Sequence, residues 1–233
     1  MNEQWPIVFR NHAEIYDSFS RAEDKGNKLL ERLSSLATCR GRRILEIGCG
    51  TGKYIELIAP ESQSYIAVDS SRRMIEFARK RCERIGGTRF IHCEAGTLPI
   101  KSSSIDVVFA SWVISGIVPW QARERVVNES LRVLKPDGHI WLFENDSGGE
   151  FMDMRDPAGA NWDKENVEWL MKRCGFSIVD RIQTEFRFPS VEKAKEILGF
   201  IMGQSALDYL KRNPRHNVIH HVLILHKAKN RIK

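Results

Sequence analysis

Three glycines separated by single residues follow a short apolar run in the stretch RRILEIGCGTGKY. Gly48, Gly50 and Gly52 leave the backbone bare at alternate positions, as is needed where a ligand approaches the main chain closely. A phosphate-binding P-loop is excluded, because that motif requires glycine where Ile47 stands and Ser or Thr where Tyr54 stands. The dinucleotide fingerprint is weakened but not excluded, since its third glycine should follow the second by three residues.

Carboxylates stand at or near the ends of three successive strand-like runs. Glu46 precedes the glycines, in an apolar run where a buried charge is costly unless a cation or hydrogen-bond donors meet it. Asp69 ends the second run and suits the paired hydroxyls of a ribose, because a carboxylate offers two acceptor oxygens. Glu94 ends the third run, placed to accept from an amine such as that of adenine. A ligand with an ammonium group, a ribose and an adenine but no polyphosphate matches this set, and S-adenosylmethionine fits that description.

The elements that position these residues alternate along the chain. Apolar runs typical of buried strands lie at 43–47, 65–68, 89–92, 105–110 and 139–143, and helix-period segments lie at 53–59, 72–85 and 121–134. This alternation predicts an α/β fold, a Rossmann-like doubly wound sheet that is mostly parallel and covered on both faces. Ligands then bind at the carboxyl ends of the strands.

The flanking segments complete one predicted domain over 1–233. A helical lid is expected at 1–38, the cofactor-binding core at 40–145 and a helical insertion at 189–213. Between core and insertion we expect a helix over 163–174 and a strand over 176–188, and the run VIHHVLILHKA follows the insertion as the last strand. The insertion, with a break near Gly203, and the N-terminal WPIVF are expected to roof the reacting centre as an apolar pocket.

Four stretches in order carry a family resemblance: ILEIGCGTGKY, VDSSRRMIEFARKR, EAGTLPIKSSSIDVVFAS and LRVLKPDGHIWLFE. Over roughly residues 40–145 the chain resembles the class I S-adenosylmethionine-dependent methyltransferases, in their methyltransferase-11-like group. The resemblance implies a seven-stranded sheet whose last strand runs antiparallel. In two places the chain departs from the family: Glu94 stands where Asp is commoner, and SWVISGIV lacks the His that many relatives carry after the fourth strand. The second departure leaves the acceptor chemistry open.

The resemblance also implies roles for single residues. It places Glu46, Gly48 and Gly50 at the methionine end, and Asp69 at the ribose. Met74 then packs on adenine, although its spacing alone favours a core position. The whole set expected to bind the cofactor is Glu46, Gly48, Cys49, Gly50, Asp69, Ser70, Met74, Glu94, Ala95 and Ser111.

Candidates for catalysis follow from the sulfonium methyl group, which is already activated. The protein has to align the reactants and exclude water, and it needs a base only if the nucleophile carries a proton. Glu144 and Asp146, in FENDSGGEF, are candidate proton acceptors, and Tyr16 is a candidate lid residue or donor. Each could equally be a binding or capping residue.

No metal is expected. His220 and His221 point to opposite faces if HNVIHH is a strand, and no Cys or carboxylate recurs at ligand spacing. The basic run within 72–84 lacks interleaved aromatic residues, so a solvated helix face is favoured over nucleic-acid binding.

Composition sets the remaining expectations. Five cysteines without a C-x-x-C pair favour a reducing compartment, and no apolar span or leader pattern is seen, so a cytoplasmic protein is expected. The net charge of +6 permits an acidic partner without requiring one. We expect a monomer or homodimer that methylates a small molecule. A methyltransferase for RNA or protein, and a catalytically silent cofactor-binding or dehydrogenase-like module, stay as alternatives.

Overall fold

A computed structural model of the chain describes residues 4–36 and 39–229, and within them seven strands form one sheet in the order β3-β2-β1-β4-β5-β7-β6. The strands are β1 (Arg43–Ile47), β2 (Ser64–Asp69), β3 (Thr88–His92), β4 (Ile105–Ser111), β5 (Leu134–Asn145), β6 (Ser177–Arg187) and β7 (Asn217–Ala228). From β3 to β5 in this order, each strand is parallel to its neighbour. Strand β7 runs antiparallel to both of its neighbours, β5 and β6. The predicted mostly parallel sheet with an antiparallel last strand is confirmed.

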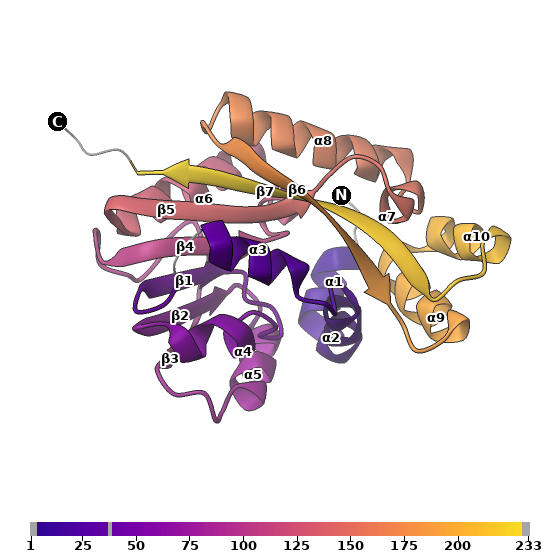
Figure 1. Ribbon diagram of the computed structural model, residues 1–233, viewed down its shortest axis with the longest axis horizontal. Helices are drawn as coiled ribbons and strands as arrows, with labels where there is room; N and C mark the ends of the chain where they lie inside the picture. Colours follow the sequence, from indigo (N-terminus) through magenta and orange to yellow (C-terminus); the bar gives the residue numbers. More distant parts are fainter. Residues whose placement is uncertain (1–3, 37–38, 230–233) are drawn as a thin grey trace.

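The α-helices among the described residues are α1 (Gln4–Asn11), α2 (Ala13–Ala22), α3 (Lys28–Leu36), α4 (Ile55–Ile58), α5 (Arg72–Arg81), α6 (Trp120–Val133), α7 (Glu150–Asp153), α8 (Pro157–Lys172), α9 (Val191–Met202) and α10 (Gln204–Arg212). None of these described helices is long and apolar enough to cross a bilayer. In Figure 1, α1 and α2 lie to the left of the lower right ends of β6 and β7, and α9 and α10 lie to the right of these ends.

Strand residues alternate between two apolar layers, one on each face of the sheet. Ile44 and Phe109 belong to the layer that α3, α4 and α5 cover, whereas Leu45 and Val108 belong to the layer that α6 and α8 cover. Both faces of the sheet are therefore covered by helices and shielded from water, which explains why the strand sequences are continuous apolar runs.

A third apolar cluster joins the N-terminal helices to the insertion. It contains Val8 and Ala22 from the N-terminal side and Leu198 and Ile201 from α9. The break between α9 and α10 falls at Gly203, whose φ of 79° suits glycine. The insertion is thus packed against the N-terminal helices.

Some boundaries differ from the sequence prediction for local reasons. Helix α8 begins at Pro157 rather than at residue 163, because the Asp156 side chain accepts a hydrogen bond from the Gly159 amide at 2.7 Å and proline fits the first helical position. Helix α5 ends at Arg81, four residues before the predicted end. The described part of the N-terminal region, residues 4–36, forms three helices, with a turn at 23–27 between α2 and α3.

Candidate functional site

A cavity of about 570 Å³ opens at the carboxyl ends of the central parallel strands. Seven of the residues that the sequence assigned to the cofactor line it: Gly48, Gly50, Asp69, Ser70, Glu94, Ala95 and Ser111. Glu46, Cys49 and Met74 do not line it, and their side chains are at most 5% exposed. The sequence prediction thus located the cavity, while three of its members lie in the packed layers behind it.

The glycine loop is held between two neighbours that leave no room for side chains. A Cβ at Gly48 would lie 2.4 Å from the Cγ2 atom of Val113, and φ there is +66°. A Cβ at Gly50, where φ is +51°, would lie 3.0 Å from the Tyr16 ring. Glycine is required here by the backbone conformation and by close approach together.

Asp69, at the end of β2, links that strand to the glycine loop that follows β1. Its Oδ2 accepts a hydrogen bond from the Gly50 amide at 3.0 Å, and its Oδ1 accepts one from the Ser71 amide at 2.8 Å. Burial raises the pKa of Asp69 above its usual value, although the two amide bonds oppose that effect. Each oxygen can still accept a second hydrogen bond, so the carboxylate can serve a ligand while it fixes the loop.

Glu46 lies beneath the glycine loop, and its burial favours the protonated carboxyl group. Its Oε2 accepts a hydrogen bond from the Tyr65 hydroxyl at 2.9 Å, and the side chain is 1% exposed. Burial raises the pKa of Glu46 to about 8, and the hydrogen bond from Tyr65 only partly offsets this. No cation among the described residues compensates the loss of water that the ionised form of Glu46 would suffer, which is why burial favours the protonated form.

The raised pKa of Glu46 predicts a pH-dependent stability. The folded state favours the protonated form, so its contribution to stability is fully present below the ordinary pKa of 4.5 and is lost as pH rises through about 8. Glu46→Gln, which is neutral throughout, should gain stability relative to the wild type across that window. Urea unfolding at several pH values measures this, with exposed Glu124→Gln as control. A difference that does not change with pH would contradict the prediction.

A second, smaller cavity of about 110 Å³ adjoins the first. Phe9, Tyr16, Trp112 and Gly116 line both cavities. The other residues that line the small cavity are aromatic or polar: Phe19, Ser20, Glu23, Ser115, Asn145, Phe151, Arg155, Trp162, Asp163, Phe186 and His220. Two spaces of different character therefore meet at a shared wall.

Trp112 is placed in that wall by an unusual backbone conformation. It follows β4 with φ of +53°, and its amide donates to the Phe143 carbonyl at 2.8 Å. Positive φ in a large residue that is not glycine costs free energy, and such residues cluster at functional sites. Trp112 was not among the residues predicted to form the site, since nothing in SWVISGIV signals positive φ.

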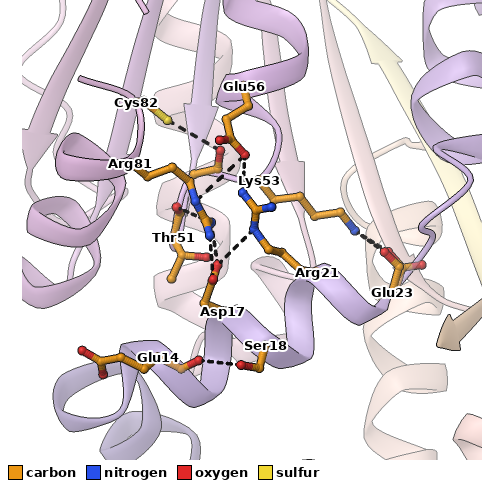
Figure 2. A network of polar contacts seen from close by, with 11 residues as sticks. Glu14, Asp17, Ser18, Arg21, Glu23, Thr51, Lys53, Glu56, Arg81 and Cys82 are labelled. Carbon is orange, nitrogen blue, oxygen red and sulfur yellow. Dashed lines mark hydrogen bonds and ion pairs between the residues drawn. The ribbon is translucent and has the colours of Figure 1, made fainter. Parts of the chain in front are cut away.

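Helix α2 forms the opposite wall and is clamped to the glycine loop and to α5. Figure 2 shows the polar network. The Arg81 guanidinium donates to both Asp17 oxygens at 2.5 and 2.6 Å and to the Thr51 carbonyl at 3.0 Å. Lys53 Nζ lies 2.8 Å from Glu23 Oε2 at the end of α2. Helix α2 is thus held against the glycine loop and α5 by ion pairs with Lys53 and Arg81.

Breaking the Asp17–Arg81 pair should lower stability. Asp17→Asn leaves the Arg81 charge, whose side chain is 12% exposed, without its partner. We expect a loss of about 2 kcal/mol in the free energy of unfolding, below the value for fully buried pairs. Glu14→Gln is the matched control, because its pair with Arg73 is exposed and should contribute less than about 1 kcal/mol. Equal losses in the two variants, measured by urea unfolding, would contradict the clamp.

The sequence-predicted proton acceptors do not reach the small cavity. Glu144 is buried away from it, and burial with nearby Asp163 raises the pKa of Glu144 to about 8. The Oδ2 of Asp146 lies 2.6 Å from Nη1 of Arg181, outside both cavities. Asn145, which lies between Glu144 and Asp146 in the sequence, lines the small cavity instead. Tyr16 does line both cavities, and burial raises its pKa.

Two further expectations concern the insertion and the histidines. Of the described residues, none from 189–213 lines either cavity, so the insertion supports the N-terminal helices from behind and does not roof the centre itself. Trp5 to Ile7 of WPIVF lie outside the residues whose side chains are described, and Phe9 lines both cavities. No metal-binding group of three His, Cys, Asp or Glu occurs in the described part of the chain.

His220 lines the small cavity but was not among the residues that the sequence assigned to the site. Val218, His220 and Val222 alternate on the buried face of β7, and each is at most 1% exposed. A histidine on the buried face of an alternating strand was the available signal. It was considered only as a metal ligand.

Known proteins share this fold and sequence pattern. Residues 44–138 match the family model described as a methyltransferase domain. The chain is 33% identical over 140 residues to demethylmenaquinone methyltransferase of Clavibacter sepedonicus, covering 56% of each chain. It is 28% identical over 167 residues to 27-O-demethylrifamycin SV methyltransferase of Amycolatopsis mediterranei, covering 70% of this chain and 58% of the relative. It thus spans little more than half the length of these two relatives.

Solved structures agree with the fold. YcgJ protein from Bacillus subtilis matches with a TM-score of 0.60 at 20% identity, covering 87% of this chain and 98% of that one. N-methyltransferase NodS from Bradyrhizobium japonicum, solved with S-adenosyl-L-homocysteine, matches with a TM-score of 0.53 at 15% identity, covering 95% and 92%. The strand order and the glycine loop at the strand ends define a Rossmann-like domain of the methyltransferase type. The family match and the relatives identify residues 44–138 as a methyltransferase domain, similar to those of class I.

Proposed function

We propose that the chain binds S-adenosylmethionine in the larger cavity and transfers its methyl group to a small molecule held in the smaller one. The observation that carries this proposal is the pair of adjoining cavities with a common wall of Phe9, Tyr16, Trp112 and Gly116. An in-line transfer requires a donor site and an acceptor site that are in contact, so that the reacting atoms can be aligned.

The residues of the larger cavity suit that cofactor. Asp69 offers acceptor oxygens for a ribose, and Glu94 with the Ala95 amide stands at the end of β3 for an adenine edge. Arg10 and Arg125 also line the cavity, so cationic and anionic groups are both present for a ligand that carries charges of both signs. When bound, the cofactor supplies an activated methyl group on a sulfonium.

The chain's own contribution is alignment and exclusion of water. Tyr16 packs over Gly50 from the lid, and Trp112 closes the other side, so both side chains stand where donor and acceptor meet. The small cavity is lined mostly by aromatic rings, which favours a compact, largely apolar acceptor over a polymer. One relative is named for demethylmenaquinone and the other for 27-O-demethylrifamycin SV. Both names support a small-molecule acceptor.

Calorimetry with the purified chain tests the proposal. Binding of S-adenosylmethionine or its demethylated product is expected at micromolar level, about 8 kcal/mol. Asp69→Ala should weaken binding by roughly 1.5–3 kcal/mol, the scale of hydrogen bonds to a charged group. Exposed Asp208→Ala, on α10, is the control that should leave binding unchanged. Heat with NADH and none with S-adenosylmethionine would favour the dehydrogenase-like alternative and overturn the proposal.

A further inference from the structure

Arg155 is a mostly buried arginine whose hydrogen-bond donors are largely unused. Its side chain is 17% exposed, and it lines the small cavity. Among the described residues, the guanidinium makes a single long hydrogen bond, from Nη2 to the Gly159 carbonyl at 3.5 Å. Nε has no hydrogen-bond partner there, although it lies 3.3 Å from Oδ2 of Asp163 in an ion pair. Donors in this state cost free energy unless a ligand or water supplies acceptors.

Other arginines that are at least as buried have their donors satisfied by the protein. Arg81, whose side chain is 12% exposed, donates hydrogen bonds at 2.5, 2.6 and 3.0 Å. The fully buried Arg123 donates from Nε, Nη1 and Nη2 at 2.6, 2.7 and 3.1 Å. Neither of these two lines the small cavity, whereas Arg155 does. The unused donors are therefore a feature of the cavity wall.

The Nη end of the Arg155 guanidinium is the part that a ligand can reach. Nε is enclosed, but Nη1 is not among the enclosed atoms, and it has no hydrogen-bond partner in the described part of the chain. Nη2 keeps a second hydrogen beside its long bond to Gly159. The planar fork of a guanidinium matches the two oxygens of a carboxylate. The free donors therefore suit an oxyanion better than a single neutral acceptor.

Both carboxylates that line the small cavity already face a cation of the protein. Lys53 Nζ lies 2.8 Å from Oε2 of Glu23, which is 2% exposed. Arg155 pairs with Asp163, whose Oδ2 also accepts a hydrogen bond from the Asn145 amide at 3.1 Å. A cationic acceptor is therefore not required to balance these two carboxylates.

A third cation, Arg123, lies behind the cavity wall without such a pair. Its guanidinium is 4.4 Å from the centre of the Trp162 ring, which lines the cavity, and it donates only to two carbonyls and one amide oxygen. The carboxyl group of Glu144 acts on Arg123, but burial and nearby Asp163 raise the pKa of Glu144 to about 8, which favours its neutral form. The buried groups around the cavity thus carry an excess of positive charge, which favours an anionic ligand.

Size and lining restrict the ligand further. A cavity of about 150 Å³ is known to hold benzene, so about 110 Å³ admits roughly one ring. The rings of Phe19 and Phe151 lie 4.9 and 5.0 Å from that of Phe186, and all three side chains line the cavity. Such a lining suits a planar apolar group.

We infer that Arg155 binds a carboxylate of the acceptor, and that the acceptor is a compact aromatic acid whose ring lies among the aromatic side chains of the small cavity. This inference rests on the proposed methyl transfer and names the acceptor class of the same site. Arg155 binds and orients the acceptor and takes no part in the bond changes at the methyl group. The carboxylate supplies acceptors for the unused donors and balances the excess positive charge.

Benzoate and benzamide test the inference, because they differ in charge and hardly in shape. We would measure both affinities by calorimetry with the chain saturated with S-adenosyl-L-homocysteine. The wild type should bind benzoate at least about tenfold more tightly than benzamide. Arg155→Met should weaken benzoate binding by about 10–100-fold and benzamide binding by less than about threefold. Arg155→Lys should weaken benzoate less than Arg155→Met does, because an ammonium keeps the charge and lacks the planar fork.

Two further variants separate ligand binding from a structural role of the ion pair. Arg181→Met removes the arginine of another pair, with Asp146 outside both cavities, and should leave both affinities unchanged. Asp163→Asn removes the negative charge that competes with the ligand for Arg155, so benzoate should bind more tightly than it does to the wild type. Equal weakening of benzoate and benzamide in both Arg155→Met and Asp163→Asn would show a structural pair and overturn the inference.

Cofactor binding distinguishes failure of this inference from failure of the proposed function. The wild type and the variants should bind S-adenosyl-L-homocysteine equally, which also shows that they are folded. A wild-type chain that binds neither S-adenosyl-L-homocysteine nor S-adenosylmethionine would overturn the proposed function and this inference with it. A wild-type chain that binds the cofactor, but benzoate no more tightly than benzamide, would overturn the carboxylate class alone. If Arg155→Met does not fold, Arg155→Lys decides: weaker binding of benzoate alone supports the inference, and unchanged binding overturns it.

Discussion

Gly50→Val is expected to abolish cofactor binding, with a loss greater than about 100-fold, or roughly 3 kcal/mol. A Cβ at Gly50 would already stand 3.0 Å from the Tyr16 ring, and the two valine methyl groups would extend into the space that Tyr16 and the ligand share. The amide of Gly50 also donates to Asp69, so a shift of the loop would displace the Asp69 carboxylate, which lines the same cavity. Calorimetry measures the loss, and circular dichroism should stay near that of the wild type.

Gly87→Val is the matched control for backbone strain. Gly87 also has positive φ, +77°, but no heavy atom lies within 4 Å of a Cβ built there. Both variants therefore carry the cost of a left-handed residue, about 1–2 kcal/mol, while only Gly50→Val obstructs the cavity. If Gly50→Val bound the cofactor as Gly87→Val does, the glycine loop would not be the binding site.

Arg123→Leu is expected to lower the free energy of unfolding by about 3–5 kcal/mol, the range for disrupting a buried charged network. The Arg123 side chain is fully buried between the rings of Trp120 and Trp162, at 4.1 and 4.4 Å. It donates to the carbonyls of Ile117 and Ser115 at 2.6 and 3.1 Å. Leucine leaves the Ile117 carbonyl and the Asn166 amide oxygen without the donor that Arg123 supplies, in the segment that carries the wall between the two cavities, so cofactor affinity should fall as well.

Urea unfolding measures this effect, and exposed Arg173→Leu, at the end of α8, controls for loss of an arginine at the surface. That control should change stability by less than about 0.5 kcal/mol. Arg123→Lys should recover only part of the loss, because an ammonium cannot stack between two rings and reach both carbonyls together. Full recovery by lysine would show that charge alone is needed.

The position of the larger cavity was predictable from the sequence, because it depends on secondary structure and strand direction, which are set locally along the chain. Strand and helix alternate in the sequence, and parallel strands bring their carboxyl ends to one edge of the sheet whatever the side chains are. Gly48, Gly50, Asp69 and Glu94 were therefore placed correctly at one cavity by position alone. The degree of burial was not predictable in this way, and so Glu46 and Met74 were assigned to a cavity that they lie behind.

The small cavity, which we propose holds the acceptor, is formed by contacts between distant segments. His220, Asn145 and Glu23 meet from β7, β5 and the turn after α2, and no short motif contains two of them. The direction of a side chain at a strand end changes with a single residue, which is why Asn145 lines the small cavity and Asp146 lies against Arg181. By itself the sequence determined the sheet, the bare loop and the strand-end carboxylates, because backbone conformation and hydrophobic period are local properties. The tertiary structure alone decided which polar groups line the small cavity, because long-range packing sets the burial and the hydrogen-bond partners of each side chain.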